Sequence, residues 1–393
     1  MMTTRRKREL VTGVCLLAGA VALGTIASLL DERAAAQGQA AVQAPMFEVD
    51  PLWPKPLPNN WTLGNAIGIA VDSADHVWMI HRTTGVNDNF QTPGASCCTV
   101  APPILEFNEA GDLTSSWGGP GEGFTWPDSE HGLWIDYKGN FWISGNGDAD
   151  TQVLKFTSSG TFLLQIGTHG VHNGSNDTAN LWKPTEGSVD EATDEVYVSD
   201  GYGNKRVIVF DSETGQYKRH WGAYGNRPDD TDLGNYDPNA PPAQQFRNPV
   251  HCAEISNDDL VYVCDRQNDR IQVFHTDGSF MKEGFIAKQT LGSGSVWDIA
   301  FSRDPQQTYI YLADGGNHNI HILLRDTLEV LTTIGSGGKL PGQLYGTHNL
   351  ATDSHGNLYV AETFGARIQK FVYKGLGPVT KRDQGVLWPR STK

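Results

Sequence analysis

Three histidines occupy the same place in a pattern that recurs six times along this chain. The six copies align on an Asp or Ser that ends a hydrophobic run, at positions 72, 136, 190, 256, 302 and 353. Five residues before that position, alternate copies carry His131, His251 and His348. Neutral imidazole is a good ligand for zinc, and also for copper, iron and nickel. The alternation therefore predicts one transition-metal site with ligands from three separate copies.

Each copy contains the features of four short strands. A hydrophobic strand, a turn and a second strand rich in Tyr, Trp and Val precede a third strand, such as "RVIVF", "RIQVF" or "RIQKF", and then a fourth. Four strands per unit in six successive units are typical of a β-propeller. The copies also resemble NHL repeats. We therefore predict an all-β, six-bladed β-propeller of NHL type over residues 60–378, with four antiparallel strands per blade.

Propeller geometry explains how residues far apart in sequence could form one site. The first strand of each blade lies nearest the axis, and all six run in the same direction, so equivalent positions form a ring at one height. Alternate blades stand about 120° apart, so three imidazoles converge on the axis and leave a fourth metal position open, as catalytic zinc requires. The alternative is that these histidines only form hydrogen bonds with backbone or water.

The N-terminus differs in composition from the repeats. The segment "TTRRKREL" is basic, and residues 10–30 form an uncharged apolar run, which is typical of an export signal with cleavage near Ala36. At about 21 residues the run is also long enough to span a bilayer, so a membrane anchor is the alternative. We therefore assign residues 1–36 to a signal or anchor, 37–59 to a linker and 379–393 to a C-terminal tail. Both alternatives place the propeller in the periplasm or outside the cell.

Charge and loop composition limit the class of partner. The formal net charge of −15 argues against nucleic acid, whose binding proteins present a basic face. Three Gly-, Pro-, Asn- and Asp-rich insertions, at 86–103, 168–182 and 224–245, are long loops of the kind that carry specificity on a rigid scaffold. We expect a monomer that acts on a small-molecule or peptide substrate and contacts a membrane only through the N-terminal segment.

Cysteine spacing predicts one disulfide. Cys252 and Cys264 flank "SNDDL" symmetrically, so they would face each other across a hairpin and could be oxidised in an exported protein. Two small buried thiols are the alternative. Cys97 and Cys98 are adjacent in a predicted loop.

Several segments resemble the peptidyl-α-hydroxyglycine α-amidating lyase family. They are "HGLWIDYKGNFWIS", "KPTEGSVDEATDEVYVSDGYGNKRVIVF", "NPVHCAEI", "VCDRQNDRIQVF" and "GTHNLATDSHGNLYVAE". Members of that family are six-bladed propellers with a zinc ion on three histidines near the axis. The resemblance implies that His131, His251 and His348 bind zinc. It also implies a lyase that breaks the C–N bond of a peptidyl-α-hydroxyglycine and releases a peptide amide and glyoxylate.

The same resemblance suggests catalytic residues. Tyr202, in "SDGYGNKR", matches the tyrosine that the family uses as a base, and Arg266 and Arg82, in "CDRQNDR" and "IHRTTG", match arginines around the substrate. A tyrosine acting as a base needs a nearby cation, and an arginine fork suits the substrate carboxylate. The alternatives are a blade-rim aromatic for Tyr202 and a salt bridge to an interblade acid for Arg266.

The chain departs from the family next to the third histidine. Animal members place an Asp there that helps to hold a structural calcium ion, whereas this chain has Asn349. Asparagine offers an oxygen without the charge, so we expect a weakened or empty calcium site. Gly203 also replaces a family cysteine, so that disulfide is missing.

Two other functions fit a propeller of this type. One is a lactonase-like hydrolase, although such enzymes usually hold calcium with acidic and Asn ligands. The other is a non-catalytic NHL-repeat binding scaffold of the cell envelope.

Overall fold

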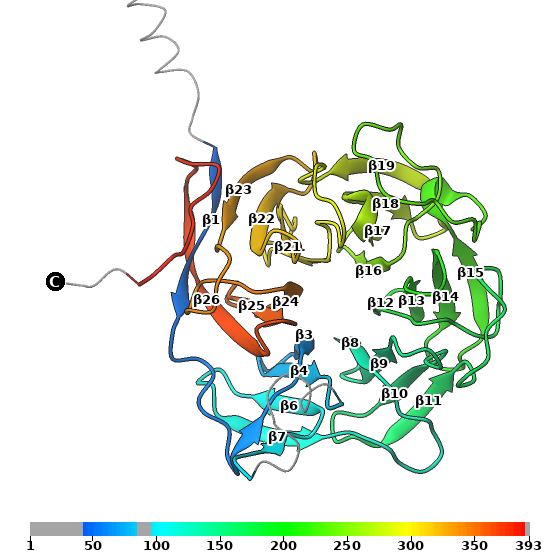
Figure 1. The fold of residues 1–393 in the computed structure, drawn as a ribbon, viewed down its shortest axis with the longest axis horizontal. Coiled ribbons are helices and arrows are strands. Elements are labelled where there is room, and N and C mark those ends of the chain that lie inside the picture. The colour runs from blue at the N-terminus through cyan, green and yellow to red at the C-terminus, as the bar shows by residue number, and fades with distance from the viewer. Residues whose placement is uncertain (1–41, 85–95, 390–393) are drawn as a thin grey trace, which may run out of the picture. The chain divides into compact units, whose positions relative to one another are not determined.

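Six four-stranded sheets, the blades, are arranged around a common axis in the computed structural model, which describes residues 42–84 and 96–389 (Figure 1). Blade 1 contains β3 (Ala66–Val71), β4 (Val77–His81), β6 (Ile104–Phe107) and β7 (Leu113–Trp117). Blade 2 contains β8 (Glu130–Ile135), β9 (Phe141–Gly145), β10 (Val153–Phe156) and β11 (Phe162–Ile166). Blade 3 contains β12 (Glu186–Asp190), β13 (Glu195–Asp200), β14 (Arg206–Asp211) and β15 (Tyr217–Trp221).

The second half of the ring repeats this order. Blade 4 contains β16 (Val250–Ile255), β17 (Leu260–Asp265), β18 (Arg270–His275) and β19 (Phe280–Phe285). Blade 5 contains β20 (Asp298–Phe301), β21 (Tyr309–Asp314), β22 (Asn319–Leu324) and β23 (Val330–Ile334). Blade 6 contains β24 (Thr347–Thr352), β25 (Leu358–Glu362), β26 (Arg367–Pro378) and β1 (Gln43–Asp50). The predicted six-bladed propeller is confirmed.

The remaining elements are short. The strands β2 (Trp61–Thr62) and β5 (Thr99–Val100) form a small parallel sheet, and η1 (Ala223–Gly225) and η2 (Arg266–Asn268) are 3₁₀ turns. Within the described ranges, no helix has the length and apolar character needed to cross a membrane. The predicted export signal or anchor at 1–36, with its apolar run at 10–30, lies outside the described residues.

The inner strands follow one another around the axis in chain order. Each inner strand contacts the next, and β24 contacts β3, which closes the ring. The inner strands and the third strands of all blades begin at the same end of the propeller, where the second and fourth strands end, because neighbouring strands within a blade are antiparallel. We call this end the site face.

An Asp stabilises the turn after the inner strand. Asp136 accepts hydrogen bonds from the backbone N–H groups of Lys138 and Asn140, at 3.0 and 2.8 Å, and from Nε1 of Trp142 at 3.2 Å. Asp72 makes the same set of contacts in blade 1. The recurring Asp of the sequence pattern is therefore a turn residue that also anchors the second strand.

Buried acid–arginine pairs fix the turn between the second and third strands on the site face. Asp200 pairs with Arg206 at 2.8 Å and Asp265 pairs with Arg270 at 2.8 Å, and all four side chains are fully buried. In blade 6, Glu362 forms the same kind of pair with Arg367. Each arginine begins a third strand, so the pair holds both ends of the intervening turn.

The prediction that residues 37–59 form a linker is wrong for β1. This strand lies beside β26 and supplies the outer strand of blade 6, where Phe47 and Val49 are buried in the core shared with blade 5. An N-terminal strand in the last sheet holds the two ends of the ring together. Part of the predicted tail at 379–393 is also ordered, since Val379 and Leu387 pack against the same core.

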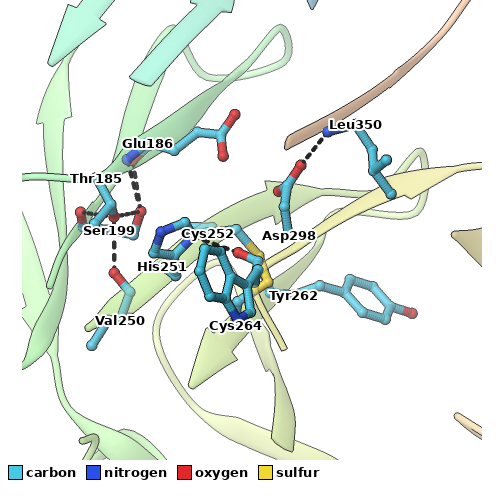
Figure 2. The surroundings of a disulfide bond; sticks show 12 residues. Thr185, Glu186, Ser199, Val250, His251, Cys252, Tyr262, Cys264, Asp298 and Leu350 are labelled. Atoms are coloured by element: carbon cyan, nitrogen blue, oxygen red, sulfur yellow. Dashed lines mark hydrogen bonds between the residues drawn. A yellow bond between two sulfur atoms is a disulfide. The ribbon is translucent and has the colours of Figure 1, made fainter. Parts of the chain in front are cut away.

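The structure contains the predicted disulfide between Cys252 and Cys264, which joins β16 to β17 (Figure 2). Cys97 and Cys98 form a second disulfide between adjacent residues. Cys252 directly follows His251, so the first disulfide lies next to one of the three recurring histidines.

We predict that Arg206→Ala lowers the free energy of unfolding by about 3–5 kcal/mol, because it leaves the Asp200 carboxylate buried without a counter-charge. Urea unfolding followed by tryptophan fluorescence measures the change. Lys55→Ala, which breaks the exposed pair with Asp112, is the matched control and should change stability far less. Equal losses in the two variants would contradict the role assigned to the buried pair.

Candidate metal centre

The structure brings the three recurring histidines together at the axis. His131, His251 and His348 are each the second residue of an inner strand, in β8, β16 and β24. Their ring centroids are 5.1, 4.9 and 4.9 Å apart, and one nitrogen of each lies within 4.8 Å of the others. All three side chains are buried. This near-equilateral arrangement is the one that the register predicted.

A backbone irregularity occurs at each of these histidines. Strand pairing shifts register between Glu130 and Leu133 in β8, between Val250 and Ala253 in β16, and next to His348 in β24. A bulge bends a strand and re-aims the side chain at that point. The irregularity therefore directs the imidazoles to the axis, and it cannot be read from the strand alternation in the sequence.

Carbonyl groups of the next blade orient two of the imidazoles. The Nδ1 atom of His131 bonds to the carbonyl of Thr185 at 3.0 Å, and Nδ1 of His251 bonds to the carbonyl of Trp297. Because a carbonyl only accepts, Nδ1 carries the proton and Nε2 presents its lone pair, the form in which histidine binds a metal. Nδ1 of His348 has no hydrogen bond of good geometry within the described ranges.

The surroundings keep the imidazoles neutral. Burial and the Arg82 guanidinium lower the pKa of His131 to about 3. Burial and Arg266 lower the pKa of His251 well below its usual value, and burial and His131 do the same for His348. Metal binding requires the unprotonated ring. Three converging neutral imidazoles, two of them with oriented Nε2 atoms, therefore fit a transition-metal ion.

Tyr202 lies beside the three histidines. It belongs to the turn after β13, and its hydroxyl oxygen is 3.3 Å from Nε2 of His131 and 3.2 Å from Nε2 of His251. Gly201 allows this approach, because a Cβ there would lie 1.9 Å from the carbonyl oxygen of Val250. The alternative of a rim aromatic without contact to the centre is therefore wrong for Tyr202.

Arg266 contacts the Tyr202 hydroxyl. Its Nη1 donates a hydrogen bond to that oxygen at 3.0 Å, its Nε donates to the carbonyl of Ser293 at 2.9 Å, and its guanidinium lies over the Trp297 ring at 4.4 Å. Both partners of the Arg266 guanidinium are uncharged oxygens, and no carboxylate of the described residues pairs with it, so the interblade salt bridge considered from sequence is absent from this part of the chain.

Arg82 occupies the equivalent position three blades away. Arg82 directly follows β4 in blade 1 and Arg266 directly follows β17 in blade 4, so the two residues stand on opposite sides of the ring. Nε of Arg82 donates to the carbonyl of Glu130 at 3.1 Å, and Nη2 donates to Oδ1 of Asn146 at 3.0 Å. The site therefore has a cation on each side, of which Arg266 is buried and Arg82 is half-buried.

Two buried carboxyl groups, Glu186 and Asp298, lie in the surroundings of the Cys252–Cys264 disulfide (Figure 2). Both contact Asn349, the residue after the third histidine, where the resemblance implies calcium. Nδ2 of Asn349 donates to Glu186 at 2.9 and 3.0 Å and to Asp298 at 2.8 Å. Its Oδ1 accepts the backbone N–H of Ile69 at 2.6 Å. Because that N–H can only donate, the Asn349 oxygen must face it and the NH₂ group must face the carboxyls. Calcium needs oxygen ligands, so Asn349 does not fit the calcium role of the family aspartate.

Burial also changes the charge of these acids. It raises the pKa of Glu186 to about 7 and that of Asp298 well above its usual value. The Asn349 amide therefore links two carboxyl groups whose burial favours the neutral, protonated form.

Sequence reasoning missed several residues of this centre. Trp297 stands at the histidine position of blade 5 but has no metal-binding side chain, so its carbonyl and ring contacts were not foreseen. Glu186 and Asp298 each begin an inner strand, and no motif marks them. The inserted loops at 168–182 and 224–245 each connect an outer strand to the next inner strand, so they border the site face.

Comparisons with known proteins support the resemblance. No protein-family model matches the chain. It is 26% identical over 340 residues to peptidyl-glycine α-amidating monooxygenase A of Xenopus laevis, covering 83% of this chain and 33% of that protein. It is 25% identical over 251 residues to a probable peptidyl-α-hydroxyglycine α-amidating lyase of Caenorhabditis elegans, covering 61% and 62%. It is 25% identical over 351 residues to NHL repeat-containing protein 3 of Mus musculus, covering 84% and 85%.

The chain thus spans about a third of the length of the amidating monooxygenase. Among solved structures, a protein of unknown function from Bacteroides thetaiotaomicron superposes with a TM-score of 0.52 at 14% identity, covering 85% of this chain and 77% of that one, which concerns the fold alone. The chain is therefore a six-bladed NHL-type β-propeller related to the peptidyl-α-hydroxyglycine α-amidating lyases.

Proposed function

We propose that this protein is a zinc-dependent lyase that breaks the C–N bond of a peptidyl-α-hydroxyglycine and releases a peptide amide and glyoxylate. The observation that carries the proposal is the position of Tyr202, whose oxygen contacts Nε2 of His131, Nε2 of His251 and a guanidinium nitrogen of Arg266. A base, a cation and a metal-binding trio at one point are the groups that this reaction needs. The relatives named as amidating lyases support the same reading.

His131 and His251 would hold the metal through their Nε2 atoms, and His348 would supply the third imidazole nitrogen. When bound, zinc would act as a Lewis acid that polarises the hydroxyl group of the substrate. The carbonyls of Thr185 and Trp297 keep two of the rings in the required tautomer.

Tyr202 is assigned as the base. It takes the hydroxyl proton of the substrate while the carbon–oxygen bond becomes the aldehyde of glyoxylate and the C–N bond breaks, and it then returns that proton to the amide nitrogen. This balance needs no oxidant or reductant. The hydrogen bond from Arg266 stabilises negative charge on the Tyr202 oxygen.

Arg82 is assigned to the substrate carboxylate. Its Nε and Nη2 donate hydrogen bonds to Glu130 and Asn146 of blade 2. Its Nη1 has no hydrogen-bond partner among residues 42–84 and 96–389. A fixed guanidinium with a remaining N–H group suits a carboxylate. Burial removes water from the Arg82 guanidinium, which is unfavourable for a cation. The negative charge of a bound substrate carboxylate would compensate for that loss.

A non-catalytic binding scaffold is the second candidate. The observation in its favour is the match to NHL repeat-containing protein 3, which extends over nearly the whole of both chains. A scaffold does not need three neutral imidazoles oriented toward one point, so metal content separates the two functions.

We predict that His251→Ala loses bound zinc, from about one ion per chain to nearly none, because two imidazoles cannot replace a three-ligand site. Elemental analysis of the purified protein measures this. His355→Ala, in the exposed turn after β24, is the control and should keep the metal. Equal metal content in the two variants, or none in the wild type, would exclude the proposed centre.

We predict that Tyr202→Phe keeps the zinc but lowers kcat for glyoxylate release by about 10²–10⁴-fold, since it removes the proton acceptor alone. Glyoxylate is assayed with an N-acylated hydroxyglycine, and zinc is measured in the same sample. Retained turnover together with lost zinc would show that Tyr202 supports the metal rather than the proton transfer.

We also propose that the Asn349 amide takes the structural place of the family calcium ion. The melting temperature of the wild type should therefore be the same in EGTA and in millimolar calcium. Asn349→Asp replaces the NH₂ group by an oxygen ligand, so calcium should raise the melting temperature of that variant by about 5 °C. A calcium-dependent wild type would contradict this reading.

A further inference from the structure

Two large aromatic side chains are exposed on the site face. Phe364, in the turn after β25, is 47% exposed, and Tyr345, just before β24, is 37% exposed. Both turns lie at the end of blade 6 that carries His348. Single exposed apolar residues are common, so their exposure alone carries no conclusion.

These two rings continue a row that starts at the metal centre. The ring centroid of Trp297 is 5.6 Å from His348 and 6.4 Å from Phe364, and Phe364 is 5.6 Å from Tyr345. The ring of Trp297 is buried. We call Trp297, Phe364 and Tyr345 the aromatic row. It leads without a break from the histidines to the solvent-exposed rim.

The backbone holds the exposed part of the row in place. Thr363 N donates to the carbonyl of Gly346 at 2.9 Å, and Gly365 N donates to the carbonyl of Tyr345 at 2.9 Å, so the two turns are joined. Gly346 has a φ of +72°, and a Cβ there would lie 2.5 Å from the Phe364 ring. Phe364 therefore packs directly on a glycine backbone, in a position that is fixed before any ligand binds.

Phe364 also corresponds in register to the proposed base. Tyr202 is the second residue after β13 in blade 3, and Phe364 is the second residue after β25 in blade 6. Blades 3 and 6 are opposite each other in a six-membered ring. The proposed base and the exposed phenylalanine thus stand on opposite sides of the centre, on the same face.

We propose that the aromatic row is the subsite for an apolar or aromatic group on the acyl side of the substrate. This inference rests on the proposed function and names its substrate class, N-acylated hydroxyglycines whose acyl portion is apolar next to the scissile bond. Arg82 supplies the cation for the carboxylate, whereas Phe364 and Tyr345 present exposed ring surface. The Arg266 guanidinium covers the Trp297 ring at 4.4 Å, so Trp297 forms the inner end of the row. Lys339 lies 5.2 Å from the Tyr345 ring, which disfavours a cationic side chain at the outer end.

Binding of two unreactive probes tests the subsite without requiring turnover. N-benzoylglycine and N-acetylglycine share the carboxylate and the amide but differ in apolar area. The wild-type protein, as purified with its metal, should bind the benzoyl compound about 10-fold or more tightly than the acetyl compound, by isothermal titration calorimetry. Phe364→Ala should remove most of this preference and leave the affinity for N-acetylglycine unchanged.

Control variants separate the subsite from general effects. Tyr137→Ala removes an exposed aromatic from the turn between β8 and β9, at the opposite end of the blades, and should keep the wild-type preference. Phe364→Leu should retain part of it. Tyr345→Ala serves as a second test should Phe364→Ala fail to fold. A preference that survives both Phe364→Ala and Tyr345→Ala, or none in the wild type, would overturn the proposal.

Turnover of the N-benzoyl and N-acetyl derivatives of hydroxyglycine tests the aromatic subsite and the lyase function separately. Loss of the benzoyl preference in kcat/KM in Phe364→Ala supports both. A binding preference that depends on Phe364, without glyoxylate release from either compound, supports the subsite and refutes the lyase function. Equal turnover of both compounds by wild type and variant supports the lyase and refutes the subsite.

Discussion

The shared direction and height of the six inner strands is the constraint on which the site depends. Because the blades repeat around one axis, a residue at a fixed place in the pattern lies at a fixed height and angle. Histidines in blades 2, 4 and 6 therefore converge, Arg82 and Arg266 in blades 1 and 4 face each other, and the proposed base in blade 3 faces blade 6. The ring itself depends on β1, which closes the last sheet.

The contacts that hold the residues of the centre in place also pair polar groups that would lower stability if they were buried without a partner. Carbonyls of the next blade accept the Nδ1 protons of two histidines, and buried acid–arginine pairs fix the turns that carry Tyr202 and Arg266. The imidazoles are nonetheless kept neutral and close together, an arrangement with little stabilising value of its own. Such an arrangement, maintained against the cost of burial, is what the proposed metal centre requires.

The regular part of this structure could be predicted from sequence, whereas the parts that depend on contacts between blades could not. The repeat gave the number of blades, and its register placed all three histidines correctly. β1 was missed because in the repeat each fourth strand follows its third strand, whereas β1 precedes the whole array. The orientation of Asn349 depends on the N–H group of Ile69, 280 residues away, and no local pattern reports such a contact. Phe364 was missed because it lies in a turn after β25, outside the strand register, and no motif marks it.

The central claim is that three histidines from alternate blades form one metal centre, and X-ray absorption at the zinc edge tests it most directly. The account predicts a first shell with three imidazole nitrogens at about 2.0–2.1 Å and no sulfur. A sulfur shell at about 2.3 Å, or a shell of oxygens without imidazole scattering, would contradict it.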